Sequence, residues 1–235
     1  MEKDKYRVQG TFYAVGVGPG DPELLTIKAI NTMKACDVIA LPRSGASENI
    51  ALKIASQYIQ GKEILECDMP MIKDQEQLAR YHDQSADKIE EFLEQGRDVA
   101  FLTLGDPSIY STVMYVHHRL TDRGYRTAII PGIPSFCGAA ASLNVSLCER
   151  DEMLHIIPAT YKGAQTDSLE GTKVLMKSGK TIMKIKDALA EKKAMMVERA
   201  TMDDEKVYRD LNDLKEQSSY FSLIVIPSEE RQKEK

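Results

Sequence analysis

The chain has 235 residues, of which 36 are acidic and 31 are basic, so its formal net charge is −5. Because the basic residues are mixed among acidic ones, this balance argues against nucleic acid as the main partner, although a local group of Arg and Lys can still bind a small anion. No run of residues approaches the roughly 20 apolar positions of a membrane span. The length allows one large domain or two small ones.

The histidines and cysteines do not indicate a metal site. His117 and His118 are adjacent on a predicted helix and cannot face one metal together, and His82 and His155 lack partners at ligand spacing. No CxxC pair occurs, and the charged residues 1–7 lack the apolar segment of a signal peptide. We therefore expect a cytoplasmic protein with no metal and with four reduced, buried thiols, at Cys36, Cys67, Cys137 and Cys148.

Residues 11–17 form a short apolar run that predicts the first strand, and it opens into the glycine-rich segment 16–21. Asp21, Pro22 and Glu23 are expected to start a helix that buries Leu24, Leu25, Ile27, Ile30 and Met33. The glycines do not match the Gly-x-Gly-x-x-Gly dinucleotide spacing, because the sixth residue from Gly16 is Asp21, whose carboxylate would repel a pyrophosphate. A dinucleotide site is therefore disfavoured.

Strands and helices alternate from this point to residue 130. Further strands are predicted at 37–41, 62–65, 99–104 and 126–130, and helices at 48–59, 74–95 and 106–122. The second strand is expected to break at Pro42. Five strands that alternate with helices predict an α/β domain with a mostly parallel sheet covered on both faces.

The segment 101–110 has the features of a ligand-binding turn. A buried strand ends at Gly105, and Asp106 and Pro107 are expected to be N-cap and N1 of a helix to about Asp122, with Ile109, Val113, Val116 and Leu120 facing inward. The sequence Gly-Asp-Pro occurs at 20–22 as well as at 105–107. Because the carboxyl ends of parallel strands meet at one edge of a sheet, the two turns are expected to share a cleft there.

The prolines and glycine in residues 131–135 indicate a boundary, and we expect domains at 1–130 and 131–235 with a hinge over 131–143. In the second domain, strands are predicted at 153–157, 172–176, 194–197 and 220–226, helices at 181–191 and 203–214, and a frayed charged tail at 229–235. A C-terminal α/β domain with a mixed sheet is expected.

Three segments closely resemble the tetrapyrrole methylase family, whose members are S-adenosylmethionine-dependent methyltransferases. They are residues 15–29, 104–110 and 130–136, and they occur in the family's order. Residues 131–139 and 154–158 are most similar to the precorrin-2 or cobalt-factor II C20-methyltransferases of cobalamin biosynthesis. One departure separates the chain from uroporphyrinogen methylases, because Pro42 stands where those enzymes carry a functional carboxylate.

The resemblance implies a two-domain homodimeric enzyme that binds S-adenosylmethionine in a cleft between its domains, releases S-adenosylhomocysteine and methylates a reduced tetrapyrrole with several carboxylates. It implies substrate contacts at Pro19, Arg43 and Tyr110, and makes Tyr110 the candidate that assists proton loss. Asp106 is expected to hold the loop and the cofactor rather than carry a proton. The implied cofactor contacts are Leu104, Gly105, Asp106, Ile109, Ser135, Phe136, Met176, Ala200 and Thr201.

Three alternatives remain open at this point. The chain is compatible with another methylase of the same fold, with a nucleotide-binding oxidoreductase, and with a non-catalytic tetrapyrrole-binding module. Neither Tyr110 nor Arg43 decides among them, since a packing aromatic and a solvated loop charge explain these residues as well.

Overall fold

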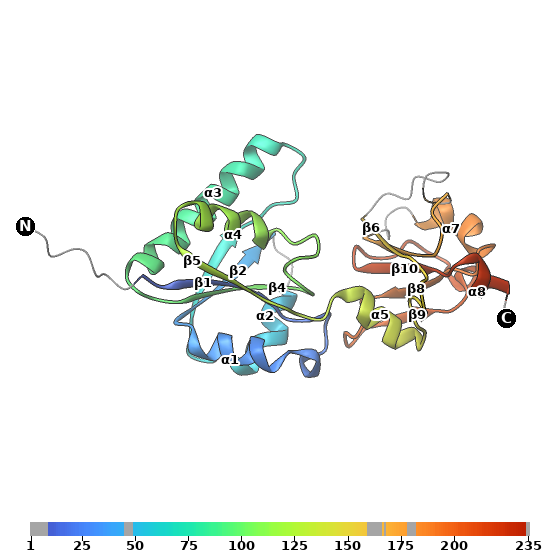
Figure 1. Cartoon of the computed structure of the whole chain (residues 1–235), viewed down its shortest axis with the longest axis horizontal. Helices are drawn as coiled ribbons and strands as arrows, with labels where there is room; N and C mark the ends of the chain where they lie inside the picture. Colours follow the sequence, from blue (N-terminus) through green and yellow to red (C-terminus); the bar gives the residue numbers. More distant parts are fainter. Residues whose placement is uncertain (1–8, 45–48, 159–165, 167, 178–181, 234–235) are drawn as a thin grey trace, which may run out of the picture. The chain divides into compact units, whose positions relative to one another are not determined.

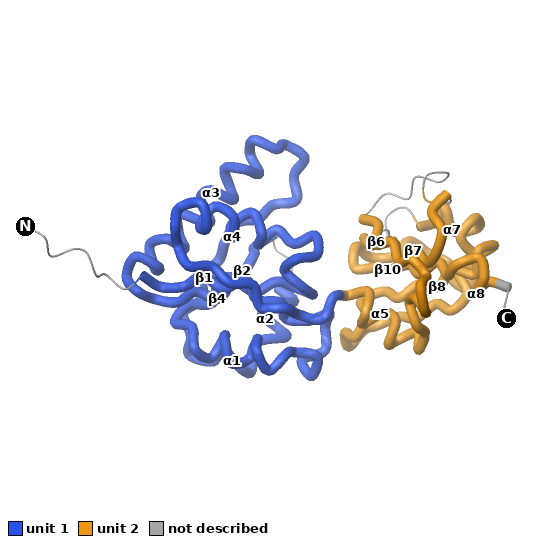
Figure 2. The backbone as a smooth tube through the Cα atoms, viewed as in Figure 1, with its two compact units in different colours: residues 1–134 blue, residues 135–235 orange. Residues whose placement is uncertain are grey.

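The computed structural model describes residues 9–44, 49–158, 166, 168–177 and 182–233. The chain divides into two compact units, Met1–Pro134 and Ser135–Lys235 (Figure 2). Each unit contains one five-stranded sheet. The expected starts of two helices, Glu48 and Thr181, and the last two residues of the charged tail lie outside the described residues.

The sheet of the first unit has the strand order β3-β2-β4-β1-β5, and all of its neighbouring strands pair in parallel. This confirms the predicted parallel sheet and places β1 in its interior, between β4 and β5. The strands are β1 (Thr11–Gly16), β2 (Val38–Arg43), β3 (Glu63–Asp68), β4 (Val99–Thr103) and β5 (Arg126–Ile130).

Both faces of this sheet are buried because successive side chains of a strand point to opposite faces. In β4, Val99 and Phe101 belong to one apolar cluster, and Ala100 and Leu102 to the other. Figure 1 shows α3 and α4 on one face and α1 and α2 on the other. These helices are α1 (Ile27–Ala35), α2 (Ile50–Ala55), α3 (Gln75–Glu94) and α4 (Val113–Asp122).

Two helices begin later than the sequence predicts. Pro22–Leu24 form only a 3₁₀ turn capped by Asp21, and Thr26 caps α1 through the Ala29 amide, so Ile27 is 76% exposed instead of buried. Likewise, α4 begins at Val113 rather than at Pro107, because the residues after Asp106 follow an irregular path. The predicted inward positions Val113, Val116 and Leu120 are nevertheless confirmed.

The strand β2 continues through Pro42 and Arg43, where a break was predicted. Proline is tolerated there because β2 pairs with β4 only from Val38 to Ala40, so its missing amide removes no bond to that neighbour. On the other side, β3 is longer than predicted and pairs with β2 as far as Asp68.

The second unit contains the predicted mixed sheet, ordered β6-β7-β10-β8-β9. The strands β6 and β7 are parallel, and β10 is antiparallel to both β7 and β8. The bounds are β6 (Leu154–Pro158), β7 (Thr172–Met176), β8 (Met195–Glu198), β9 (Lys206–Tyr208) and β10 (Ser222–Ile226), with α7 (Ile182–Ala190) among them.

Residues 135–143, within the segment expected to be a hinge, form the helix α5 (Ser135–Leu143), whose small side chains let Gly138, Ala139 and Ala140 be buried. Two predictions for this unit are wrong. Residues 203–214 form β9 and the 3₁₀ turn Leu211–Asp213 instead of a helix, since Asp210 caps that turn through the Asn212 amide. The charged tail contains a short helix, α8 (Glu229–Lys233).

Only part of the cysteine prediction holds. Cys36 and Cys67 are buried, and burial raises their pKa values to about 12 and about 11, but Cys137 and Cys148 are exposed.

Within the described ranges, none of the helices combines the length and the apolar character that crossing a membrane requires.

Candidate functional site

Three loops of the first unit meet where β1, β4 and β5 end. The Gly105 amide donates to the Gly18 carbonyl at 2.7 Å, and the Gly18 amide donates back to the Gly105 carbonyl at 3.3 Å. Both glycines have positive φ, +78° at Gly18 and +74° at Gly105, which glycine adopts without a steric penalty. The loops that carry the two Gly-Asp-Pro sequences therefore meet at one edge of the sheet, and the cleft that they are expected to share stays a prediction.

The third loop, after β5, packs against the other two through backbone atoms. A Cβ on Gly132 would lie 2.2 Å from the Gly105 carbonyl oxygen, and a Cβ on Gly16 would lie 2.7 Å from the Gly132 nitrogen. No side chain fits at either position without a shift of the backbone. The glycines at 16 and 132 therefore serve the contact between loops.

Asp106 connects two of these loops through its two carboxylate oxygens. Its Oδ1 accepts from the Ser108 amide at 2.8 Å and from the Ser108 hydroxyl, and its Oδ2 accepts from the Gly132 amide at 2.9 Å. Instead of capping α4, Asp106 fixes the turn 106–108 and ties it to the β5 loop. Each carboxylate oxygen has two lone pairs, so capacity to accept from a ligand remains.

The loop that leads into α4 presents Tyr110 to solvent. Tyr110 has φ +49° and is 50% exposed. The loop is fastened next to it by a 2.7 Å hydrogen bond between the Thr103 and Ser111 hydroxyls. Ile109 is half-buried. About half of the Tyr110 surface is therefore exposed to solvent beside the Asp106 turn.

The charges of the three loops fit a cationic ligand. Residues 16–21, 104–112 and 130–134 contain two charged side chains, Asp21 and Asp106, and both are acidic. Backbone carbonyls and the apolar side chains of Leu104 and Ile109 complete the surroundings. S-adenosylmethionine, which combines a sulfonium cation with polar and apolar parts, is compatible with this combination of groups.

The two other predicted substrate contacts, Pro19 and Arg43, differ in their exposure to solvent. Pro19 is buried, so it shapes the β1 loop rather than exposing its ring. Arg43 is 53% exposed at the end of β2, but its guanidinium already binds Asp68 Oδ1 at 2.6 Å and Glu66 Oε2 at 3.2 Å. The hydrogen bond and charge of Asp68 raise the pKa of Arg43. A substrate carboxylate would compete with these two residues.

In the second unit, three of the predicted cofactor residues lie at one end of the sheet. Met176 ends β7 and is 8% exposed, and Ala200 follows β8 and is 4% exposed, while Thr201 is half-buried. Ser135 and Phe136 begin α5 and are both half-buried. Met176 and Ala200 therefore offer little surface within this unit, and Thr201 offers more.

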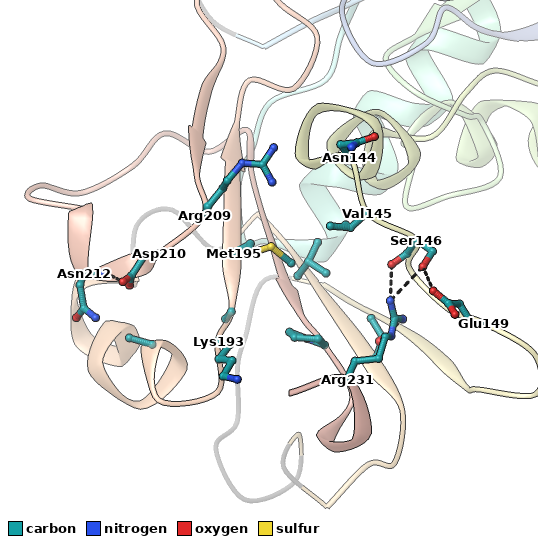
Figure 3. A pocket seen from close by; sticks show the side chains of 15 residues that line it. Asn144, Val145, Ser146, Glu149, Lys193, Met195, Arg209, Asp210, Asn212 and Arg231 are labelled. Carbon is teal, nitrogen blue, oxygen red and sulfur yellow. Dashed lines mark hydrogen bonds between the residues drawn. The ribbon is translucent and has the colours of Figure 1, made fainter. Parts of the chain in front are cut away.

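A cavity of about 620 Å³ lies at the opposite end of the same sheet, lined by Thr172 and Met195, the first residues of β7 and β8 (Figure 3). The Arg231 guanidinium at its wall donates to Glu152 at 2.7 Å, to Thr172 at 3.1 Å and to the Ser146 carbonyl at 2.6 Å. This arginine fastens α8 to the strand and loop beside it. The cavity contains none of the residues predicted to bind the cofactor.

Sequence reasoning missed the groups that hold these loops together. The missed groups are Gly132 as the partner of Asp106, the Thr103–Ser111 pair, and Glu205, whose carboxylate accepts from the Thr201 amide. For Thr103, Ser111 and Gly132, the available signal was their closeness in sequence to residues 105–107 and 131–134, whereas Glu205 is close in sequence to neither segment. The bonds themselves join residues from different loops.

Comparison with known proteins gives the family. The sequence profile of the Tetrapyrrole (Corrin/Porphyrin) Methylases matches residues 11–214. A probable cobalt-precorrin-2 C(20)-methyltransferase of Methanocaldococcus jannaschii is 37% identical over 91% of this chain and 94% of its own. A precorrin-2 C(20)-methyltransferase of Sinorhizobium is 31% identical over 93% and 95%.

A solved structure has the same fold. It is a uroporphyrin-III C-methyl transferase of Thermus thermophilus in complex with S-adenosylhomocysteine, 22% identical, with a TM-score of 0.65 over 92% of this chain and 96% of that one. The match over residues 11–214 and the relatives that are similar over nearly their whole length show that the chain belongs to the tetrapyrrole methylase family.

Proposed function

We propose that the protein is an S-adenosylmethionine-dependent C-methyltransferase that methylates C20 of precorrin-2 or its cobalt-containing counterpart in cobalamin biosynthesis. The observation that carries this proposal is the 37% identity to a probable cobalt-precorrin-2 C(20)-methyltransferase over nearly the whole of both chains. The three loops of the first unit, residues 16–21, 104–112 and 130–134, support the proposal. Their two charged side chains are acidic, so these loops contain no cation that would repel a sulfonium.

When bound, the cofactor supplies a methyl group whose carbon forms a bond to C20 while its bond to sulfur breaks, which leaves S-adenosylhomocysteine and a proton to be lost from C20. The protein's part is mainly alignment, since a displacement of this kind needs the reacting atoms about 3 Å apart and in line. Asp106 and the glycine contacts keep the 104–110 loop rigid for that purpose.

Tyr110 and Arg43 are the proposed substrate residues. Tyr110 is exposed next to the Asp106 turn, and its hydroxyl is our candidate to orient the tetrapyrrole or to assist the loss of the C20 proton. Arg43 is proposed to bind a ring carboxylate in exchange for Glu66 or Asp68, because a guanidinium binds carboxylates in a bidentate manner.

The experiment that tests this function is mass spectrometry of both precursors, metal-free and cobalt-containing, after incubation with the protein and S-adenosylmethionine. The proposal expects one added methyl group on at least one of them. Uroporphyrinogen III is offered in parallel, and its methylation in place of the two precursors would indicate another member of the family. Tight tetrapyrrole binding without transfer would indicate a non-catalytic module.

The homodimer and the cytoplasmic location are parts of the same proposal. The homodimer follows from the family resemblance and the cytoplasmic location from the cysteine pattern, and light scattering of the purified protein measures the oligomeric state directly. A mass of about one chain would contradict the proposed dimer.

A further inference from the structure

The loop after β8 in the second unit contains two residues in an unusual backbone conformation. Arg199 has φ +52° and Thr201 has φ +65°. The second is the more significant, because a β-branched side chain in the left-handed region is a genuine outlier. Such residues persist only where surrounding contacts hold them, and they are frequent at ligand-binding sites. The conformation of Thr201 therefore requires a support.

Glu205 provides contacts that can hold this conformation. Its Oε2 accepts a hydrogen bond from the Thr201 amide and a second one from the Ser142 hydroxyl at 2.6 Å. Ser142 lies on α5, 63 residues before Glu205 in the sequence. One carboxylate oxygen thus joins the outlier residue to a helix that is remote in the sequence.

The Ser142 hydroxyl has one hydrogen and two acceptors within reach. The Gly138 carbonyl lies 3.1 Å away, and Glu205 Oε2 lies at 2.6 Å. A hydrogen bond to an ionised oxygen is shorter and stronger than one to a neutral carbonyl, so the hydrogen goes to Glu205. The α5 helix therefore contributes directly to the position of the carboxylate.

Further bonds fix the loop on either side of Thr201. The Arg199 amide donates to the Phe221 carbonyl at 2.8 Å, and the Glu205 amide donates to the Met202 carbonyl at 3.0 Å. These contacts orient both ends of the loop. The Met202 amide also donates to the Arg199 carbonyl at 3.0 Å and closes the turn around residues 200–201, and the bond from the Thr201 amide to Glu205 adds a side-chain support to that turn.

We propose that Glu205 is a positioning residue for cofactor binding. Glu205 holds Thr201 in its left-handed conformation, and the hydrogen bond from Ser142 in turn holds the Glu205 carboxylate. This inference rests on the proposed function and on the family resemblance, which implies that Ala200 and Thr201 contact S-adenosylmethionine. Ala200 is buried, so the loop offers the cofactor mainly the Thr201 side chain and neighbouring backbone groups. A loop held in the bound conformation before binding loses less entropy when the ligand arrives.

The test compares Glu205→Ala, Glu205→Gln and the control Glu216→Ala, which removes an exposed carboxylate of the same unit. Calorimetric titration with S-adenosylhomocysteine is expected to show about tenfold weaker binding for Glu205→Ala. Glu205→Gln should stay within about threefold of wild type, because its amide oxygen can accept the same two bonds. In the methyl-transfer assay, Glu205→Ala should raise KM for S-adenosylmethionine with kcat nearly unchanged.

Thr201→Gly separates positioning from direct contact. Glycine adopts positive φ without help, so the effect of Glu205→Ala on binding should be smaller in the Thr201→Gly background than in wild type. An equal effect in both backgrounds would overturn the proposal, as would wild-type affinity of Glu205→Ala. Circular dichroism verifies that each variant is folded.

Amide hydrogen exchange at Thr201 without any ligand tests the support on its own. Exchange is expected to be faster in Glu205→Ala and Ser142→Ala than in wild type, and unchanged exchange in Glu205→Ala would contradict the inference. If wild-type protein fails to bind S-adenosylhomocysteine while exchange responds as expected, the proposed function fails and the role of Glu205 in the loop remains.

Discussion

Replacing Gly132 by alanine tests whether the three loops of the first unit depend on contact between backbones. The added Cβ would lie 2.2 Å from the Gly105 carbonyl oxygen and 2.8 Å from the carbonyl carbon of Gly16. Both are main-chain atoms, so no side chain can move aside. The loops would have to separate by at least about 1 Å to restore an ordinary contact.

The expected loss of stability follows from two contributions. Overpacking that shifts a backbone costs roughly 1 to 3 kcal/mol. The same shift weakens the 2.9 Å bond from the Gly132 amide to Asp106, and a hydrogen bond to a charged group contributes about 1.5 to 3 kcal/mol. We therefore expect Gly132→Ala to lower the free energy of unfolding by about 2.5 to 6 kcal/mol.

Urea unfolding followed by circular dichroism measures this loss, and calorimetry with S-adenosylhomocysteine measures the effect on the site, where at least about tenfold weaker binding is expected. The matched control is Gly61→Ala, where the new Cβ meets nothing within 4 Å but φ is +73°. That variant should lose about 1 to 2 kcal/mol from backbone strain and bind normally. Wild-type stability and affinity in Gly132→Ala would refute the reasoning.

Three further predictions concern side chains. Asp68→Asn should lower KM for the tetrapyrrole, because it removes a carboxylate that competes with the substrate for Arg43. Arg43→Ala should raise KM several-fold. Steady-state kinetics that show no change of KM in either variant would remove Arg43 from the site. In native protein, Ellman's reagent should titrate the two exposed thiols, Cys137 and Cys148, and all four after denaturation; rapid reaction of four native thiols would contradict the burial. Burial raises the pKa of Glu152, but hydrogen bonds from Ser228, Arg231 and Thr172 outweigh this effect and hold the pKa below its usual 4.5. The ionised carboxylate therefore stabilises the fold above pH 4.5, and this contribution is lost as the pH falls through the lower pKa of the folded protein. Acid unfolding of Glu152→Gln should lack this pH-dependent loss of stability.

Local patterns in the sequence were sufficient for the first sheet. Apolar strands that alternate with amphipathic helices predicted its parallel strands, and the inward positions Val113, Val116 and Leu120 were identified although α4 starts later than expected. The meeting of the Gly-Asp-Pro turns was also predictable, since parallel strands bring their carboxyl ends to one edge. The resemblance carried by these segments gave the family, which the comparisons confirm.

The tertiary structure decided what individual residues do. The second oxygen of Asp106 accepts from Gly132, 26 residues away, and this contact replaces the predicted cap of α4. The pairing of β2 with β3 places Asp68 beside Arg43. In the second unit, the Glu205 carboxylate accepts a hydrogen bond from Ser142 on α5. Sequence periodicity reports on neighbours within a helix or strand, whereas these bonds join loops from separate elements. Their partners are therefore fixed only when the chain folds.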